Sequence, residues 1–179
     1  MSIYTRTGDN GQTSLFGGRR VLKCEELVDV YGSLDELNSW MGLLASRLDT
    51  IDVQGFIREI QEDLFAIGSA LAGWKGLNEK TLLARVTQME ERIDLMESNL
   101  PKINNFILPG GSELGATVHV IRAVARRVER QTVALAQKEK ITPTIIQYLN
   151  RLSDLLFVLA RVVNQQQNAP EMIWSGKIK

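Results

Sequence analysis

A helical repeat between residues 118 and 135 sets the strongest limit on the architecture of this chain. Its core-type side chains recur at spacings of three and four, which places them on one face of an α-helix: Val118, Ile121, Ala125, Val128, Thr132 and Leu135. A second, polar face contains His119, Arg122, Arg126 and Arg130. The first face predicts burial against other helices. The second predicts either a solvated surface or a surface that meets carboxylates or an anionic ligand, because guanidinium groups bind both in a bidentate manner.

Four other segments have the same periodicity, at about 22–48, 53–71, 79–98 and 142–166. The central helix is expected from Ser112, its predicted N-cap, to about residue 140. No segment predicts a strand. The sequence therefore predicts an all-α, antiparallel five-helix bundle with ferritin-like up-down packing. We expect a single domain over residues 1–179, with an N-terminal arm (1–20), a bundle (21–168) and a C-terminal tail (169–179).

Composition excludes several classes of function. Lys plus Arg and Asp plus Glu number 21 each, so nothing favours general nucleic-acid binding. Cys24 is the only cysteine, which rules out an internal disulfide and favours a reducing cytoplasm. His119 is the only histidine, which argues against histidine-rich metal sites. We expect no export signal and no membrane span, since the most apolar segment, 152–163, is short and interrupted by Asp154 and Arg161.

The segment 4–20 is rich in glycine, threonine and Asp or Asn, which is typical of a loop. Glycine-rich backbone can turn several N–H groups onto a phosphate, so the segment is either an ordered arm or a phosphate-binding loop. It lacks the P-loop pattern. A calcium-binding EF-hand that began at Asp9 would require a glutamate where Arg20 stands.

Two further groups of residues are candidates for a site. Asp35, Glu36 and Asn38 interrupt an apolar helix; they form a solvated face, or Asp35 meets an arginine of the central helix. The segment 106–108 (Phe-Ile-Leu) is apolar for a connection, so it packs back on the bundle or lines a ligand pocket. In the last helix, Asn150 belongs to a polar stripe that continues with Asp154 and Arg161.

Four separated segments together resemble the PduO-type ATP:corrinoid adenosyltransferases. They are Tyr4–Thr13, Tyr31–Asn38, the stretch from Phe106–Ser112 through Arg122–Arg130, and Tyr148–Asp154. The resemblance covers nearly the whole chain, in order and with similar spacing.

This resemblance implies a homotrimer of five-helix bundles with active sites between neighbouring subunits. It also implies a reaction in which the adenosyl group of ATP moves to the cobalt of a reduced corrinoid, cob(I)alamin, to give adenosylcobalamin and triphosphate. Magnesium would accompany ATP. A cobalamin reductase and an adenosylcobalamin-dependent enzyme are the implied partners.

The resemblance also implies roles for individual residues. Residues implied to bind ATP are Thr5, Arg6, Thr7, Gly8, Asp9, Gly11, Thr13, Lys23, Glu129, Arg130 and Asn150, with Glu129 beside the nucleotide or its magnesium ion. Residues implied to bind the corrinoid are Asp35, Asn38 and Phe106. The implied catalytic set is Arg130 on the triphosphate, Asp35 paired with Arg126 across the subunit interface, and Phe106 against the lower face of the corrinoid.

Two positions depart from the usual pattern of that family. Arg6 stands where lysine is common, which keeps the charge but changes its reach, and Cys24 stands where an acidic residue is common. We expect the Cys24 thiol to be partly buried and inert. A competing hypothesis is a non-catalytic carrier that delivers adenosylcobalamin to a dependent enzyme, and a plain helical scaffold is the third.

Overall fold

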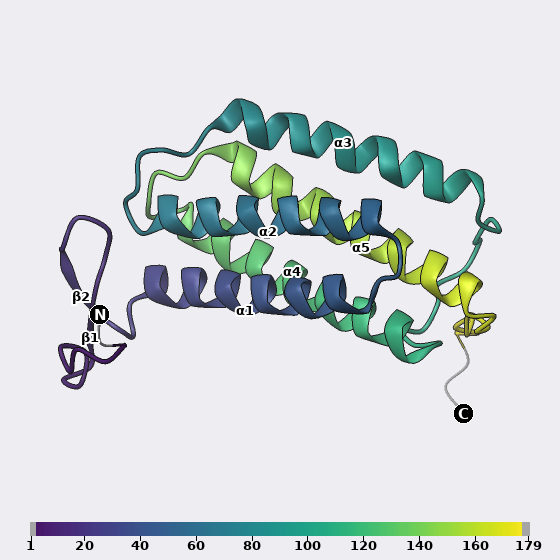
Figure 1. The fold of residues 1–179 in the computed structure, drawn as a ribbon, viewed down its shortest axis with the longest axis horizontal. Helices are drawn as coiled ribbons and strands as arrows, with labels where there is room; N and C mark the ends of the chain where they lie inside the picture. Colours follow the sequence, from purple (N-terminus) through teal and green to yellow (C-terminus); the bar gives the residue numbers. More distant parts are fainter. Residues whose placement is uncertain (1–2, 177–179) are drawn as a thin grey trace.

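The computed structural model describes residues 3–176 of the 179-residue chain. Within this range a short hairpin precedes five helices (Figure 1). The strands are β1 (Gln12–Ser14) and β2 (Arg20–Leu22). The helices are α1 (Glu26–Arg47), α2 (Ile51–Leu71), α3 (Glu79–Ser98), α4 (Glu113–Leu135) and α5 (Pro143–Gln166).

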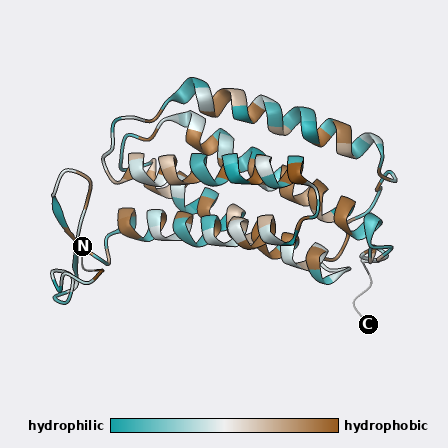
Figure 2. Ribbon diagram, in the orientation of Figure 1, coloured by the Kyte–Doolittle hydropathy of each residue, from teal (hydrophilic) through white to brown (hydrophobic). Residues whose placement is uncertain are grey.

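The helices run up and down along one long axis (Figure 1). Helix α1 packs against α2 and α4, and α5 packs against α4 and α3. The apolar faces converge on a shared core, while the outer faces are mainly hydrophilic (Figure 2). Each fully buried Leu or Ile side chain of such a core contributes about 1.5–3 kcal/mol. The predicted all-α five-helix bundle is confirmed. Among the described residues, no helix combines the length and apolarity that crossing a membrane requires.

The hairpin is the main departure from the predicted fold. Its strands pair antiparallel with Thr13 opposite Val21, and Gly17 and Gly18 turn the chain with φ of 87° and 88°. Strands of three residues are too short to show an alternating pattern, which explains why the sequence predicted only a loop. Because Arg20–Leu22 is a strand, α1 begins at Glu26 rather than near residue 22.

The connection from α3 to α4 is fastened to the end of α5 by one side chain. Asn164, which is buried, donates to the Gly110 carbonyl at 2.9 Å and accepts from the Ser112 amide and hydroxyl, each at 2.9 Å. Gly111 has φ of 104° and Gly115 lies directly beneath the Asn164 side chain, so a Cβ at either position would overlap it. Ser112 caps α4 by accepting from the Gly115 amide at 3.0 Å, as predicted.

The C-terminal tail returns to this same connection. Leu108 N–H donates to the Met172 carbonyl at 2.7 Å, and Trp174 N–H donates to the Phe106 carbonyl at 2.8 Å. Ile107 and Ile173 form an isolated antiparallel bridge. The tail therefore fixes the backbone of the segment that contains Phe106.

Candidate functional site

The polar face of α4 bears three arginines without an ion-pair partner among residues 3–176: Arg122, Arg126 and Arg130. Arg122 is half-buried, and its Nε atom has no hydrogen-bond partner within this range. Burial lowers the pKa of Arg122 because it disfavours the charged form, and the positive charge of the neighbouring Arg126 lowers it further by repulsion. Such a face is suited to an anionic ligand.

At one end of this face lies a cavity of about 820 Å³, which we call the loop cavity. Its walls come from the connection 103–109, from His119 and Arg122 of α4, from Phe157 of α5, and from the tail at 174–176. Phe106 is 79% exposed, and its ring centroid lies 6.3 Å from that of Trp174. Phe106 and Ile107 of the segment 106–108 therefore line a pocket, whereas Leu108 is exposed outside the cavity wall.

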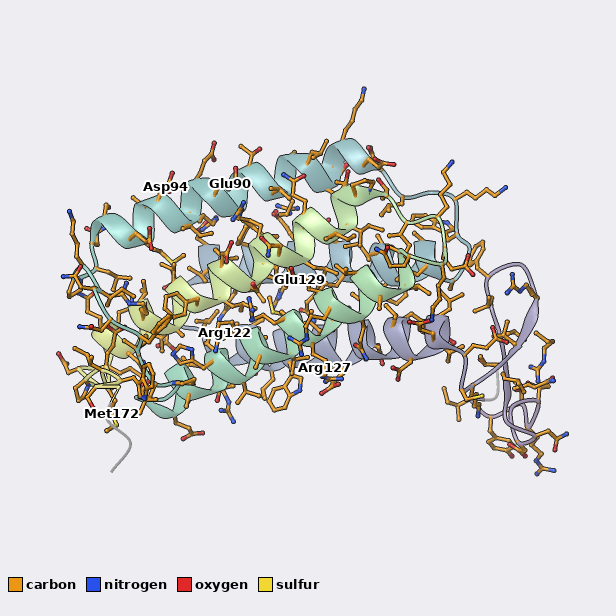
Figure 3. The ribbon with its side chains drawn as sticks, turned by 180° about the vertical axis from the view of Figure 1, so that it is seen from behind. Glu90, Asp94, Arg122, Arg127, Glu129 and Met172 are labelled. Carbon is orange, nitrogen blue, oxygen red and sulfur yellow. The ribbon has the colours of Figure 1, made fainter. Side chains whose placement is uncertain are left out.

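A second hollow of about 410 Å³ adjoins the loop cavity, and we call it the arginine hollow. It lies over α5 between α3 and α4, and Arg122 and Phe157 line both spaces. Figure 3 shows this face, with Arg122, Glu129 and Glu90 projecting from α4 and α3 on either side of α5. Arg126 also lines the hollow, whereas Arg151 is held there by Glu90 at 2.9 Å and Asp154 at 2.5 Å.

Two residues predicted to bind ATP meet further along α4. Asn150 of α5 donates from Nδ2 to Oε1 of Glu129 at 2.9 Å. Arg130 follows Glu129 in sequence, and its side chain is exposed. The structure thus brings Glu129 and Asn150 together and leaves the Arg130 guanidinium open to a ligand.

The predicted nucleotide arm forms a tight loop that precedes strand β1 and is held against strand β2 by hydrogen bonds. Arg20 donates to the Thr7 carbonyl at 2.5 Å, Lys23 N–H donates to the Gly11 carbonyl at 2.9 Å, and Thr5 and Thr7 share a hydroxyl hydrogen bond of 2.8 Å. The Lys23 ammonium lies over Gly8, since a Cβ there would be 3.3 Å from Nζ.

Other predicted arm residues shape the backbone. Arg6 has φ of 59° and Gly11 has φ of 75°. Asp9 N–H donates to the Arg6 carbonyl at 3.4 Å, and Thr13 lies within β1. The arm is therefore a compact loop with a lysine ammonium on its surface, which is compatible with phosphate binding.

One chain does not unite all the predicted residues. The arm extends beyond the end of the bundle where α1 begins, whereas the connection and tail around Phe106 lie at the opposite end (Figure 1). Helix α4 has 23 residues and joins the two ends, so they are about 34 Å apart. Over residues 3–176, no hydrogen bond links the arm to α4 or α5; its anchor is Phe16 N–H on the Ala72 carbonyl at 2.9 Å.

The predicted residues of α1 are also apart from the arginine face within one chain. Asp35 is exposed and forms no ion pair among the described residues, while its neighbour Glu36 pairs with Arg127. Asn38 is held by α2: its Nδ2 donates to the Gln61 carbonyl at 3.2 Å, and Gln61 Nε2 donates to the Asn38 carbonyl at 3.0 Å. The Asn38 Oδ1 atom is buried and lacks a partner within the described range.

Sequence reasoning placed some residues incorrectly and missed others. Arg161, assigned to the polar stripe with Asn150, is 3% exposed and binds Glu171 at 2.8 Å and the Pro101 carbonyl at 2.7 Å. Its role is structural. Cys24 is exposed rather than partly buried. Phe157 and Trp174 line the loop cavity without having been assigned to a site. His119 was placed on the polar face with Arg122 but was given no role in a site, and its burial was not predicted.

Comparisons with known proteins agree on one family. The family model for cobalamin adenosyltransferases matches residues 3–163. The corrinoid adenosyltransferase of Bacillus subtilis is 43% identical over 169 residues, covering 92% of this chain and 87% of the relative. The cobalamin adenosyltransferase of Cupriavidus metallidurans is 43% identical over 175 residues, covering 96% and 93%.

A solved structure has the same fold. It is a variant of the PduO-type ATP:corrinoid adenosyltransferase from Lactobacillus reuteri, complexed with cobalamin and ATP. It superimposes with a TM-score of 0.89 at 35% identity, over 97% of this chain and 99% of that one.

Proposed function

This chain belongs to the cobalamin adenosyltransferase family, and from this premise we propose that it transfers the 5′-deoxyadenosyl group of ATP to the cobalt of a reduced corrinoid. The observation that carries the proposal is the arginine face of α4, which leads into the loop cavity beneath an exposed Phe106. Such a surface can bind a polyphosphate and a large, partly apolar ring side by side.

The reaction is a displacement at carbon. The electron pair of cobalt(I) attacks C5′ of the ribose, a cobalt–carbon bond forms, and the C5′–O bond breaks. Triphosphate leaves with the electron pair of the broken C5′–O bond, and cobalt becomes formally cobalt(III). Since the corrinoid supplies the nucleophile, the protein has two tasks: to hold C5′ in line with cobalt, and to stabilise charge on the departing triphosphate.

The second task suits the predicted nucleotide residues. Arg130 provides an exposed guanidinium, and Asn150 orients Glu129 beside it. Lys23 and the amides of the arm provide further donors. Residues 3–176 contain no group of three or more His, Cys, Asp or Glu that could hold a metal alone. Magnesium is commonly held by one carboxylate together with substrate phosphates, which fits Glu129, and it would neutralise phosphate charge there.

We propose that the corrinoid binds at the loop cavity. Phe106 would lie against the lower face of the ring and exclude an axial ligand, which makes cobalt easier to reduce. Asn38 offers a buried amide oxygen without a partner among the described residues, beside Asp35 on α1.

We further propose that each site is shared between copies in a homotrimer. Reacting atoms must approach to about 3–3.5 Å, yet the arm and Phe106 of one chain are separated by about the length of α4. The arm of a neighbour can supply the missing half, and Asp35 would then meet Arg126 across the interface. The whole chain, 1–179, would act as one domain. Its single cysteine supports a cytoplasmic location, where a reductase supplies cobalt(I) and a dependent enzyme takes the product.

An anaerobic assay with cob(I)alamin, ATP and magnesium tests the proposed activity. Adenosylcobalamin should appear over many turnovers, with one triphosphate released per product. Binding of ATP and corrinoid without a new cobalt–carbon bond would replace the enzyme with a carrier. Failure to bind either compound would leave only a helical scaffold.

A further inference from the structure

His119 is a buried polar side chain whose hydrogen-bonding capacity is unused within the chain. It is 3% exposed, and neither Nδ1 nor Nε2 has a hydrogen-bond partner among residues 3–176. Most buried polar groups in folded proteins have such a partner, and an unpaired one destabilises the fold. An unsatisfied imidazole therefore calls for a partner that the isolated chain lacks.

The position of His119 indicates where that partner lies. Its ring is part of the wall of the loop cavity and lies one helical turn from Arg122. The centroids of the His119 and Phe157 rings are 6.2 Å apart. Phe157 can offer no conventional hydrogen bond. Arg122 can only donate hydrogen bonds. Burial is the larger cause that lowers the pKa of His119, and the positive charge of Arg122 lowers it further, while Glu171 of the tail acts in the opposite direction. These surroundings favour the neutral imidazole.

A neutral imidazole presents one N–H donor and one nitrogen acceptor. A corrin ring bears primary carboxamides along its edge, each of which also has a donor and an acceptor. Arginine and carboxylate groups each match only half of such an amide. Asn104, Asn105 and Ser175 of the same cavity also have both functions, but they are exposed; His119 is the lining residue whose donor and acceptor are buried and unpaired among residues 3–176.

We propose that His119 hydrogen-bonds a peripheral carboxamide of the bound corrinoid and thereby positions the ring in the loop cavity. This inference rests on the proposed function, since it specifies how the same site recognises its corrinoid substrate. It assigns His119 to binding of the ring rather than to the displacement step. Loss of the imidazole should therefore weaken corrinoid affinity while the turnover number changes little.

The test uses His119→Leu, which removes both hydrogen-bonding atoms at similar volume, and His119→Gln, which retains a donor and an acceptor. His119→Leu should raise the KM for cob(I)alamin about tenfold or more, with the KM for ATP unchanged and kcat within about twofold. His119→Gln should recover part of the lost affinity. Equilibrium binding of cob(II)inamide, followed by its absorption spectrum, should weaken in parallel and does not require turnover.

Thr132→Val is the matched control. It removes a buried hydroxyl from the same helix that is already satisfied by the Val128 carbonyl at 2.9 Å and lies outside the loop cavity. It should leave the KM for corrinoid unchanged. Because His119→Leu removes unpaired polar atoms from the interior, the apo variant should unfold at a temperature no lower than wild type.

Three results would overturn the inference. The first is an unchanged corrinoid KM in His119→Leu. The second is a change in oligomeric mass with unchanged corrinoid binding, which would assign His119 to a subunit interface. The third is nitrogen splitting in the electron paramagnetic resonance spectrum of bound cob(II)inamide that disappears in His119→Leu, which would make His119 a cobalt ligand. If wild type binds cob(II)inamide but makes no product, the proposed activity fails while the binding comparison still decides this inference.

Discussion

At the scale of single residues, the polar face of α4 divides into groups with different environments. Arg127 is neutralised by Glu36, whereas Arg122, Arg126 and Arg130 have no such partner among residues 3–176. Arg130 is exposed next to the Glu129–Asn150 pair. Among the described residues, Arg126 and Arg130 are therefore exposed arginines that remain open to an anionic ligand, and Arg130 is the one beside the Glu129–Asn150 pair.

Arg130→Ala should lower kcat/KM for ATP roughly 100-fold or more, because it removes a charge that stabilises the departing triphosphate. The oligomeric mass and unfolding temperature should remain those of wild type, since no ion pair within the described chain is lost. Steady-state kinetics with ATP varied will measure this. The control is Arg58→Ala, which removes an exposed arginine of α2 and should have no effect. Near-normal turnover of Arg130→Ala would remove Arg130 from the site.

His119 should make stability depend on pH near neutrality. Burial, and to a smaller extent Arg122, lower the pKa of His119 in the folded protein below its ordinary value of about 6.5. As the pH falls below that value, the unfolded chain takes up a proton that the folded chain does not, so the free energy of unfolding decreases. His119→Leu should lose this dependence.

The measurement is urea unfolding of apo wild type and His119→Leu from about pH 7.5 to about pH 5.5, with stability expected to shift in favour of the variant as the pH falls. His119 is the only histidine, so the difference between the two proteins isolates its titration. Parallel curves over this range would exclude a lowered pKa at His119.

At the scale of elements, the tail and the connection from α3 to α4 act as one unit. Backbone hydrogen bonds join Phe106 to Trp174 and Leu108 to Met172, and Arg161 ties the Pro101 carbonyl to Glu171. The Trp174 ring lies beside the Phe106 ring at the mouth of the loop cavity. The tail therefore supports the position of Phe106.

Trp174→Ala should raise the KM for corrinoid roughly fivefold, because it removes an aromatic neighbour of Phe106 but leaves the backbone bridge intact. The KM for ATP should not change. Met172→Ala, in the same tail but outside the cavity wall, is the control. Equal effects of the two substitutions would indicate a general loosening of the tail.

A buried polar network joins α2, α3 and α5. Asp63 accepts from Arg85 Nε at 2.9 Å and from the Tyr148 hydroxyl at 3.1 Å, and Tyr148 is fully buried. Burial raises the pKa of the Asp63 carboxyl, although Arg85 and Tyr148 act in the opposite direction. The carboxylate thus depends on both partners for its place in the interior.

Asp63→Ala should lower the free energy of unfolding by about 3 kcal/mol, because it leaves Arg85 and Tyr148 without their acceptor, and Tyr148→Phe should lower it by about 1 kcal/mol. Urea titration measures both. Asp52→Ala, which breaks the exposed pair with Arg92 at 3.0 Å, should have a much smaller effect. A loss at Asp63 no larger than that at Asp52 would contradict a structural role for the network.

The sequence predicted the bounds of individual helices better than the contacts between segments that are far apart in the chain. Helix α3 and helix α5 have the predicted bounds, because their apolar periodicity and their flanking turns agree. The β1–β2 hairpin was not predicted, since three-residue strands leave no pattern. The roles of Arg161 and Trp174 depend on where the tail returns, which no local spacing encodes.

At the scale of the whole molecule, the bundle separates the arm from Phe106. If the arm binds ATP and Phe106 contacts the corrinoid, as proposed, these two ends must come together, and within a single copy they lie apart. A closed ring of identical subunits solves this by giving each copy the arm of its neighbour. This separation supports the proposed sharing of each site between copies, whereas the number of three subunits is implied by the resemblance to the family.

Mixed oligomers test this requirement together with the chemistry. Lys23→Ala and Phe106→Ala chains, each first shown to be defective alone, are coexpressed with different tags, and only oligomers that contain both tags are kept. In any mixed trimer one site of the three combines an intact arm with an intact Phe106, so adenosylcobalamin should form at about one third of the wild-type rate. If each site lay within one chain, no mixed trimer would contain an intact site, and formation no faster than by the single variants would contradict the account.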